Sequence, residues 1–372
     1  MMAAETSRSR GLQQSKVVSP SLGRQWIRRA IANCYFHSGM PALLRPVRDR
    51  YHLAPSADAK WFKYSLEKRR EPSARILYYH RVNDDGDPFF PALSTAFFEQ
   101  QMRFVRRHYR VVSLAALLQV LSGGPTEPVV AITFDDGYQD NYQNAFPILQ
   151  GLGLPATIFL ATGSLDSGEP LWFEQLALAF KRTGREYVDL EIRAPQRFHM
   201  RTEAERLQSN GAVFDLLRGL PDSHRRQWVA HVLRELGPAD GGERSGKMLS
   251  WDQVRQMSAH RISFGGHTVS HPFLSKLSPE EAQWEVSECK RRIEHELQRP
   301  AEHFAYPNGR QEDVGPQSKA VVRNAGYRAA VSTVWGTNYR STDLMELRRG
   351  QPWEASQSLF AYKLDWYQLV ND

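Results

Sequence analysis

The sequence has 372 residues, 41% hydrophobic and 24% charged, which suffices for two or three domains or for one barrel with additions. The net charge of +7 is unevenly spread, because residues 1–75 carry 15 Lys/Arg against 5 Asp/Glu and the remainder is slightly acidic. No nucleic-acid recognition motif accompanies this basic segment, so a nucleic-acid-binding protein is not expected. Two distant cysteines, Cys34 and Cys289, exclude a disulfide scaffold and lack the spacing of a metal site.

Residues 1–74 are predicted to form a basic, partly disordered extension. Residues 1–23 are rich in Ser, Gln and Arg, and residues 25–36 place apolar side chains at helical spacing. The second stretch predicts a short amphipathic helix that lies on a membrane or packs on the body. Neither a transmembrane run nor a secretory signal peptide is expected. We therefore expect a cytoplasmic protein with peripheral contact to the inner membrane face through this extension.

Strands and helices alternate from residue 75 onwards. Apolar and β-branched runs predict strands at 75–80, 129–134, 155–161, 261–265, 303–306 and 328–331. Helical spacing and capping residues predict helices at 97–108, 111–121, 141–151, 278–297 and 316–325, and one that begins after Ser250. This alternation is typical of parallel strands joined by crossover helices.

Residues 171–247 differ from their surroundings. Helices are predicted at 172–181, 203–217 and 224–236, with one weak strand at 187–192. We interpret this stretch as a helical insertion over one end of the parallel-stranded body. Residues 351–372 are expected to be a C-terminal tail that packs on that body.

The strand at 129–134 runs directly into Asp135, Asp136 and Gly137. Two carboxylates at the mouth of a parallel strand are costly to desolvate unless a cation or a proton compensates them. An isolated Asp-Asp-Gly is more often a surface turn. A functional interpretation therefore needs support from elsewhere in the chain.

That support comes from His267 and His271. Pro272 follows directly and Gly265 and Gly266 precede, which indicates a loop after a strand and not a helix. Two imidazoles and one carboxylate of the Asp pair would make a three-ligand site with open positions, as in catalytic divalent-metal sites. Zinc is the default cation for that donor set.

Four motifs occur in a consistent order: Tyr78-Tyr-His-Arg-Val82, Thr133-Phe-Asp-Asp-Gly137, His267-Thr-Val-Ser-His271 and Phe304-Ala-Tyr-Pro-Asn-Gly309. With them, residues 75–350 resemble the polysaccharide deacetylase family (carbohydrate esterase family 4, NodB-homology domain). The resemblance implies a distorted (β/α) barrel of about seven strands. It also implies a hydrolase that removes N-acetyl groups from sugars in exopolysaccharide biosynthesis, with a divalent metal ion as cofactor.

The resemblance also implies roles for individual residues. Asp136, His267 and His271 would bind the metal, and Asp135 would be the general base. The cation lowers the pKa of a bound water and polarises the amide carbonyl, so an adjacent free carboxylate can take the proton of that water. The backbone N–H of Asn308 would stabilise the oxyanion.

The sequence departs from the family pattern in two places. Ala305 occupies the position of an arginine that orients the base, and Leu347-Arg-Arg349 lacks the histidine of a late Leu-x-His motif. Neither arginine can replace the histidine as general acid, because arginine does not release its proton at working pH. Arg348 or Arg349 would instead replace the missing arginine beside Asp135. The candidates for the general acid are then His80 and Asp135 itself, which would return the proton that it took from the water.

The expected partner is an N-acetylated sugar polymer or a lipid-linked oligosaccharide, with Trp172 expected in the cleft. Two alternatives remain at this point. The missing Arg and His are compatible with a catalytically silent carbohydrate-binding member. The second alternative is an amidohydrolase that cleaves a non-sugar amide.

Overall fold

The computed structural model describes residues 73–123, 129–237, 247–351 and 356–365. The basic extension with its expected amphipathic helix lies outside the described residues. Within the described ranges, no helix combines the length and hydrophobicity needed to cross a membrane.

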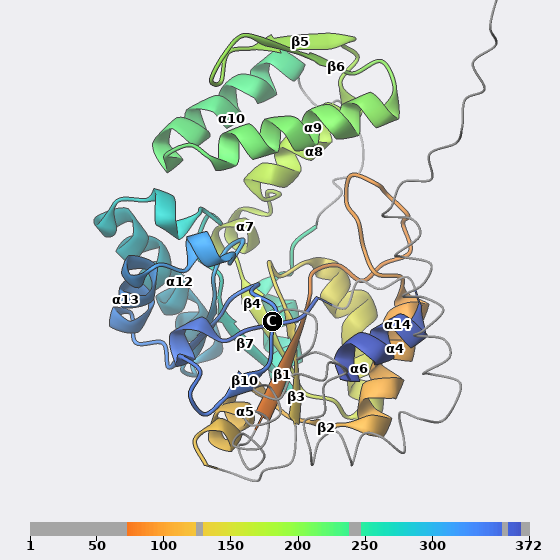
Figure 1. Cartoon of the computed structure of the whole chain (residues 1–372), viewed down its shortest axis with the longest axis vertical. Helices are drawn as coiled ribbons and strands as arrows, with labels where there is room; N and C mark the ends of the chain where they lie inside the picture. The colour runs from red at the N-terminus through yellow and green to blue at the C-terminus, as the bar shows by residue number, and fades with distance from the viewer. Residues whose placement is uncertain (1–72, 124–128, 238–246, 352–355, 366–372) are drawn as a thin grey trace, which may run out of the picture.

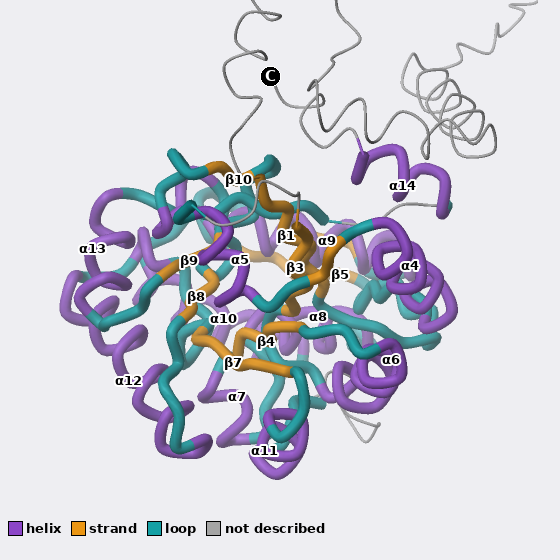
Figure 2. The backbone as a smooth tube through the Cα atoms, turned by 90° about the horizontal axis from the view of Figure 1, so that it is seen from below, coloured by secondary structure: helices purple, strands orange, loops and turns teal. Residues whose placement is uncertain are grey.

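A curled sheet of eight strands forms the centre of the molecule (Figure 2). Its main path is β10-β1-β3-β4-β7-β8-β9, with β2 on the side of β3. All pairings are parallel except that of β10 with β1. The strands are β1 (Ser73–Tyr79), β2 (Arg110–Val111), β3 (Val129–Phe134), β4 (Ala156–Leu160), β7 (Ile262–Gly266), β8 (His303–Ala305), β9 (Ala329–Val331) and β10 (Asn338–Tyr339).

A short segment, residues 347–350, joins the two sides of this sheet. Leu347 pairs with Val331 of β9, and Gly350 pairs with Leu77 of β1, both in parallel. The Tyr78 N–H donates to the Gly350 carbonyl at 3.1 Å. The segment therefore connects the curled sheet into the distorted barrel that the sequence predicted.

Helices surround the barrel on the outside (Figure 2). The predicted helix at 141–151 begins as a π-helix, Asn141–Ala145, and continues as α6. Ser113 and Ser278 cap α5 and α12, as predicted. The helices are α4 (Thr95–His108), α5 (Leu114–Leu121), α6 (Phe146–Leu152), α7 (Thr162–Ser167), α11 (Trp251–Ser258), α12 (Pro279–Leu297), α13 (Pro316–Asn324) and α14 (Gln357–Asp365).

The alternation of side chains along β3 explains how the strand presents its carboxylate. Val129 and Ala131 belong to the apolar cluster inside the barrel, which α5 closes at one end. Val130, Ile132 and Phe134 belong to the cluster between the strands and the outer helices. Because successive strand residues point to opposite faces, the inward side of β3 continues through Thr133 to Asp135.

The region predicted as a helical insertion forms a group of helices with a small two-stranded sheet beside the barrel (Figure 1). Its buried apolar residues cluster together with Phe89, Phe90 and Phe273 of the barrel. It contains one strand, β6, that the sequence did not predict. The sequence carries no signal for this strand because Phe198 is its only buried residue and no alternation is visible. The insertion comprises α8 (Trp172–Arg182), β5 (Tyr187–Leu190), β6 (Gln196–His199), α9 (Glu203–Arg218) and α10 (Asp222–Leu236).

Candidate active site

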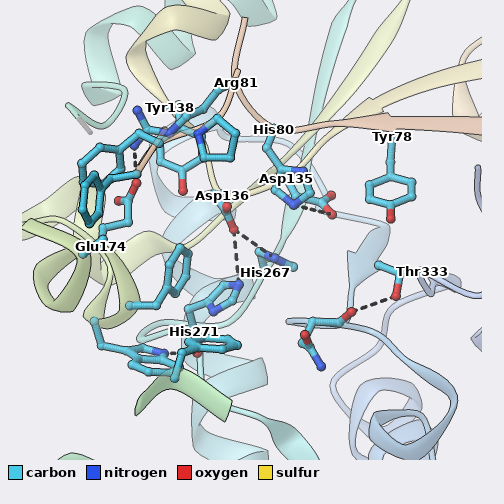
Figure 3. Close-up of a pocket in the computed structure, with 18 of the residues that line it drawn as sticks. Tyr78, His80, Arg81, Asp135, Asp136, Tyr138, Glu174, His267, His271 and Thr333 are labelled. Atoms are coloured by element: carbon cyan, nitrogen blue, oxygen red, sulfur yellow. Dashed lines mark hydrogen bonds and ion pairs between the residues drawn. The ribbon is translucent and has the colours of Figure 1, made fainter. Parts of the chain in front are cut away.

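A cavity of about 810 Å³ opens where the barrel meets the insertion (Figure 3). The barrel contributes polar residues that follow its strands, and the insertion contributes Asn210, Gly211 and Phe214 of α9. An aromatic wall also borders the cavity, formed by Phe89, Phe90, Trp172, Phe173 and Phe273. This is the position expected for a ligand site in an α/β fold, at the carboxyl ends of parallel strands.

Asp136, His267 and His271 converge at the base of this cavity. The Nε2 atoms of both histidines lie 3.3 Å from Asp136 Oδ1, and all three side chains are buried. Asp136 and His271 have φ angles of 72° and 55°. These left-handed conformations, unusual for residues other than glycine, turn the side chains toward one point.

The hydrogen bonding of His267 indicates what lies between these atoms. Its Nδ1 is 2.7 Å from the Ala305 carbonyl oxygen, so Nδ1 carries the proton and the neutral ring directs the Nε2 lone pair at Asp136. A lone pair facing a carboxylate oxygen requires a proton or a cation between them. Two donors at about 2.0–2.1 Å from a tetrahedral ion lie about 3.3 Å apart, so the three residues fit a divalent metal such as zinc.

The pKa shifts of Asp136 and His271 agree with this arrangement. Burial lowers the pKa of His267, but without a cation Asp136 and Asp135 outweigh burial and the net pKa is raised. Burial raises the pKa of Asp136, but the neighbouring imidazoles of His267 and His271 outweigh it, and the net pKa is well below its usual range. Burial lowers the pKa of His271 more than Asp136 raises it. An ionised carboxylate and a neutral imidazole are the forms that bind metals.

Asp135 is held by Arg349. The guanidinium is fully buried and donates from its two terminal nitrogens to Oδ1 and Oδ2, both at 2.7 Å. Arg349 also donates to the Ser332 carbonyl at 2.7 Å and to Thr133 Oγ1 at 3.2 Å. Burial raises the pKa of Asp135, but Arg349 outweighs it, and the net pKa is lowered. Asp135 is thus an ionised carboxylate in a fixed orientation.

Of the two arginines considered from the sequence, the structure places Arg349, and not Arg348, beside Asp135. Arg348 is exposed, because successive residues of the extended segment 347–350 point to opposite sides. Arg348 is therefore corrected as a site residue. Arg349 takes its place as the partner of Asp135.

His80 and Asn308 both line the cavity. The His80 side chain is 32% exposed, and its Nε2 lies 4.0 Å from Asp135 Oδ2. Asn308 has φ 61°, and its carbonyl accepts a hydrogen bond from Thr333 Oγ1 at 2.8 Å. Among the described residues, the Asn308 backbone N–H has no acceptor, so it is available to a ligand.

Sequence reasoning missed a buried group beside the metal ligands. The Arg81 guanidinium lies 4.0 Å from the centre of the Tyr138 ring and pairs with the Glu174 carboxylate. Arg81 follows β1 and Glu174 begins the insertion, 93 residues later. Glu174 has the sequence signal of an ordinary acidic residue in a first helical turn, so nothing in the sequence indicated this pairing.

Comparison with known proteins assigns the chain to a family. The model described as polysaccharide deacetylase matches residues 122–330. YxkH of Bacillus subtilis (strain 168), which bears a polysaccharide deacetylase name, is 23% identical over 277 residues, 74% of this chain and 69% of YxkH. The poly-beta-1,6-N-acetyl-D-glucosamine N-deacetylase of Escherichia coli (strain K12) is 34% identical over 119 residues, 31% of this chain and 16% of that enzyme.

Solved structures show the same fold. The deacetylase PplD of Streptococcus pyogenes, in complex with acetate, superposes with a TM-score of 0.51 at 20% identity, covering 76% of this chain and 92% of PplD. IcaB of Ammonifex degensii gives 0.51 at 18% identity, covering 80% of this chain and 98% of IcaB. The class of enzyme is that of hydrolases acting on carbon–nitrogen bonds other than peptide bonds. The chain belongs to the polysaccharide deacetylase family.

Proposed function

We propose that this protein removes N-acetyl groups from an N-acetylated sugar polymer or a lipid-linked oligosaccharide in exopolysaccharide synthesis. The observation that carries the proposal is the pairing of Asp135 with Arg349 next to the convergent Asp136, His267 and His271. Poly-β-1,6-N-acetyl-D-glucosamine is the first substrate to test, because the E. coli relative is named for that polymer.

Asp136, His267 and His271 would hold a divalent cation, with zinc as the first choice. When bound, such a cation polarises the amide carbonyl and lowers the pKa of water. Asp135 makes no bond to these ligands and stays ionised through Arg349. It would accept the proton of the attacking water as general base.

The remaining steps fall to Asn308 and His80. The free backbone N–H of Asn308 would donate to the oxygen that becomes negative when the carbonyl is attacked. His80, partly exposed to the cavity near Asp135, would give a proton to the departing amine. Arg349 does not serve as the acid, because guanidinium keeps its proton at working pH.

The test is acetate release by the full chain supplied with zinc, on poly-β-1,6-N-acetyl-D-glucosamine oligomers and on N-acetylated glycolipids. Asp135→Asn is expected to lower kcat by about 10²–10⁴-fold while zinc binding persists. No acetate from any of these substrates by the zinc-loaded wild type would count against the proposal. A sugar affinity equal in wild type and Asp135→Asn, without turnover, would instead identify a silent binding protein.

The cellular location remains a proposal of its own. The excess of Lys and Arg in residues 1–75 supports contact with an anionic membrane surface on the cytoplasmic side. Sedimentation of the full chain with phosphatidylglycerol vesicles, reversed by salt, is the expected result. Equal sedimentation with neutral phosphatidylcholine vesicles would contradict it.

A further inference from the structure

The first turn of α8 contacts the metal-ligand group at consecutive residues. Trp172 Nε1 donates to the His271 carbonyl at 3.0 Å. The Phe173 ring meets the His271 imidazole edge to face at 5.2 Å. Glu174 forms the buried ion pair with Arg81, and both residues line the same cavity. The insertion therefore begins inside the site, and α8 leads from there to α9 and α10 (Figure 1).

Trp172 is itself held by the rest of the insertion. Its ring stacks on Phe214 of α9 at 5.5 Å with an interplanar angle of 5°, and the Arg225 guanidinium of α10 lies 4.3 Å from its centre. Arg225 is fixed in turn by Asp222, to which its Nε donates at 3.0 Å. Only 9% of Trp172 is exposed. The ring therefore borders the cavity, as the sequence predicted, while most of its surface is packed between protein groups.

His271 needs such support because of its backbone. A φ of 55° is left-handed and unfavourable for a histidine unless neighbouring groups hold it. Thr268 Oγ1 accepts the His271 N–H at 3.1 Å, which fixes one backbone polar group from within the loop. The indole of Trp172 fixes the other, the carbonyl, and it comes from the insertion.

We propose that Trp172 is a positioning residue that holds His271 in its metal-binding conformation. The helical insertion is then part of the metal site and not only a lid over it. This inference rests on the proposed function, in which His271 is a metal ligand.

The test compares Trp172→Phe with Trp228→Phe. The first keeps an aromatic ring and removes the N–H. The second makes the same change on α10, at a half-buried tryptophan that does not line the cavity. Zinc affinity is measured on the full chain by competition with a chelating indicator. Trp172→Phe is expected to weaken zinc binding about five- to tenfold, and Trp228→Phe less than twofold.

Two further measurements separate positioning from loss of structure. Saturating zinc should restore most of the acetate release of Trp172→Phe, which a damaged fold would not allow. Phe214→Leu, which removes the stacking partner and keeps the N–H, should weaken zinc binding in the same direction and by less.

Wild-type zinc affinity in Trp172→Phe, or an equal loss in Trp228→Phe, would overturn the inference while leaving the proposed function intact. A wild-type chain that binds no zinc would overturn both.

Discussion

Replacement of Arg349 by Met should be the most destabilising change in the site. The guanidinium makes two hydrogen bonds to Asp135 and one each to Ser332 and Thr133, all in a place without solvent. Its removal leaves a buried carboxylate without a partner, which costs about 3–5 kcal/mol. The measurement is urea unfolding of the metal-free chain at pH 7.

Arg348→Met is the matched control, because the neighbouring arginine is exposed. It should change the free energy of unfolding by less than about 0.5 kcal/mol. Combining Arg349→Met with Asp135→Asn should recover part of the loss, since no buried charge is then left unpaired.

The pH dependence follows from the lowered pKa of Asp135. A carboxyl whose pKa is depressed by folding contributes stability above its unfolded pKa of about 3.9, and loses it as the pH falls through the folded value. The difference between wild type and Arg349→Met should therefore shrink below about pH 4. An Arg349→Met protein as stable at pH 7 as Arg348→Met would refute the reasoning.

Two further predictions concern histidines. His80→Gln should lower kcat about 100-fold with a smaller change in KM. A change confined to KM would instead assign His80 to substrate binding. Burial lowers the pKa of His303 to about 4, so the unfolded chain binds an extra proton between about pH 6.5 and that value, and stability falls on acidification. The loss should reach about 3 kcal/mol in urea unfolding and should be absent in His303→Gln; an unchanged pH slope in that variant would contradict this account.

The sequence was sufficient to predict elements with a strong periodic signal. The apolar run before Asp135 and the capping box at Ser278 lead to β3 and α12 at the expected positions. The same analysis failed for β6, where alternation is masked by exposed polar residues on both sides of Phe198.

The candidate site divides in the same way. The order of the motifs predicted that Asp136, His267 and His271 form one site, and in the structure these three side chains converge. The choice between Arg348 and Arg349 depended on which side chain points inward from segment 347–350. No periodicity reveals this in so short a segment, because its orientation is set by pairing with strands distant in sequence. The contact of Trp172 with His271 is missed for the same reason.

The location of Arg349 also matters for how the protein is made. Asp135 and its partner are 214 residues apart along the chain. A ribosome adds about 5–20 residues per second, so the Asp135 carboxylate is synthesised at least about 10 seconds before the arginine that neutralises it. Contacts so distant in sequence also form slowly. The surroundings of Asp135 are therefore completed only once segment 347–350 has been synthesised and closes the barrel.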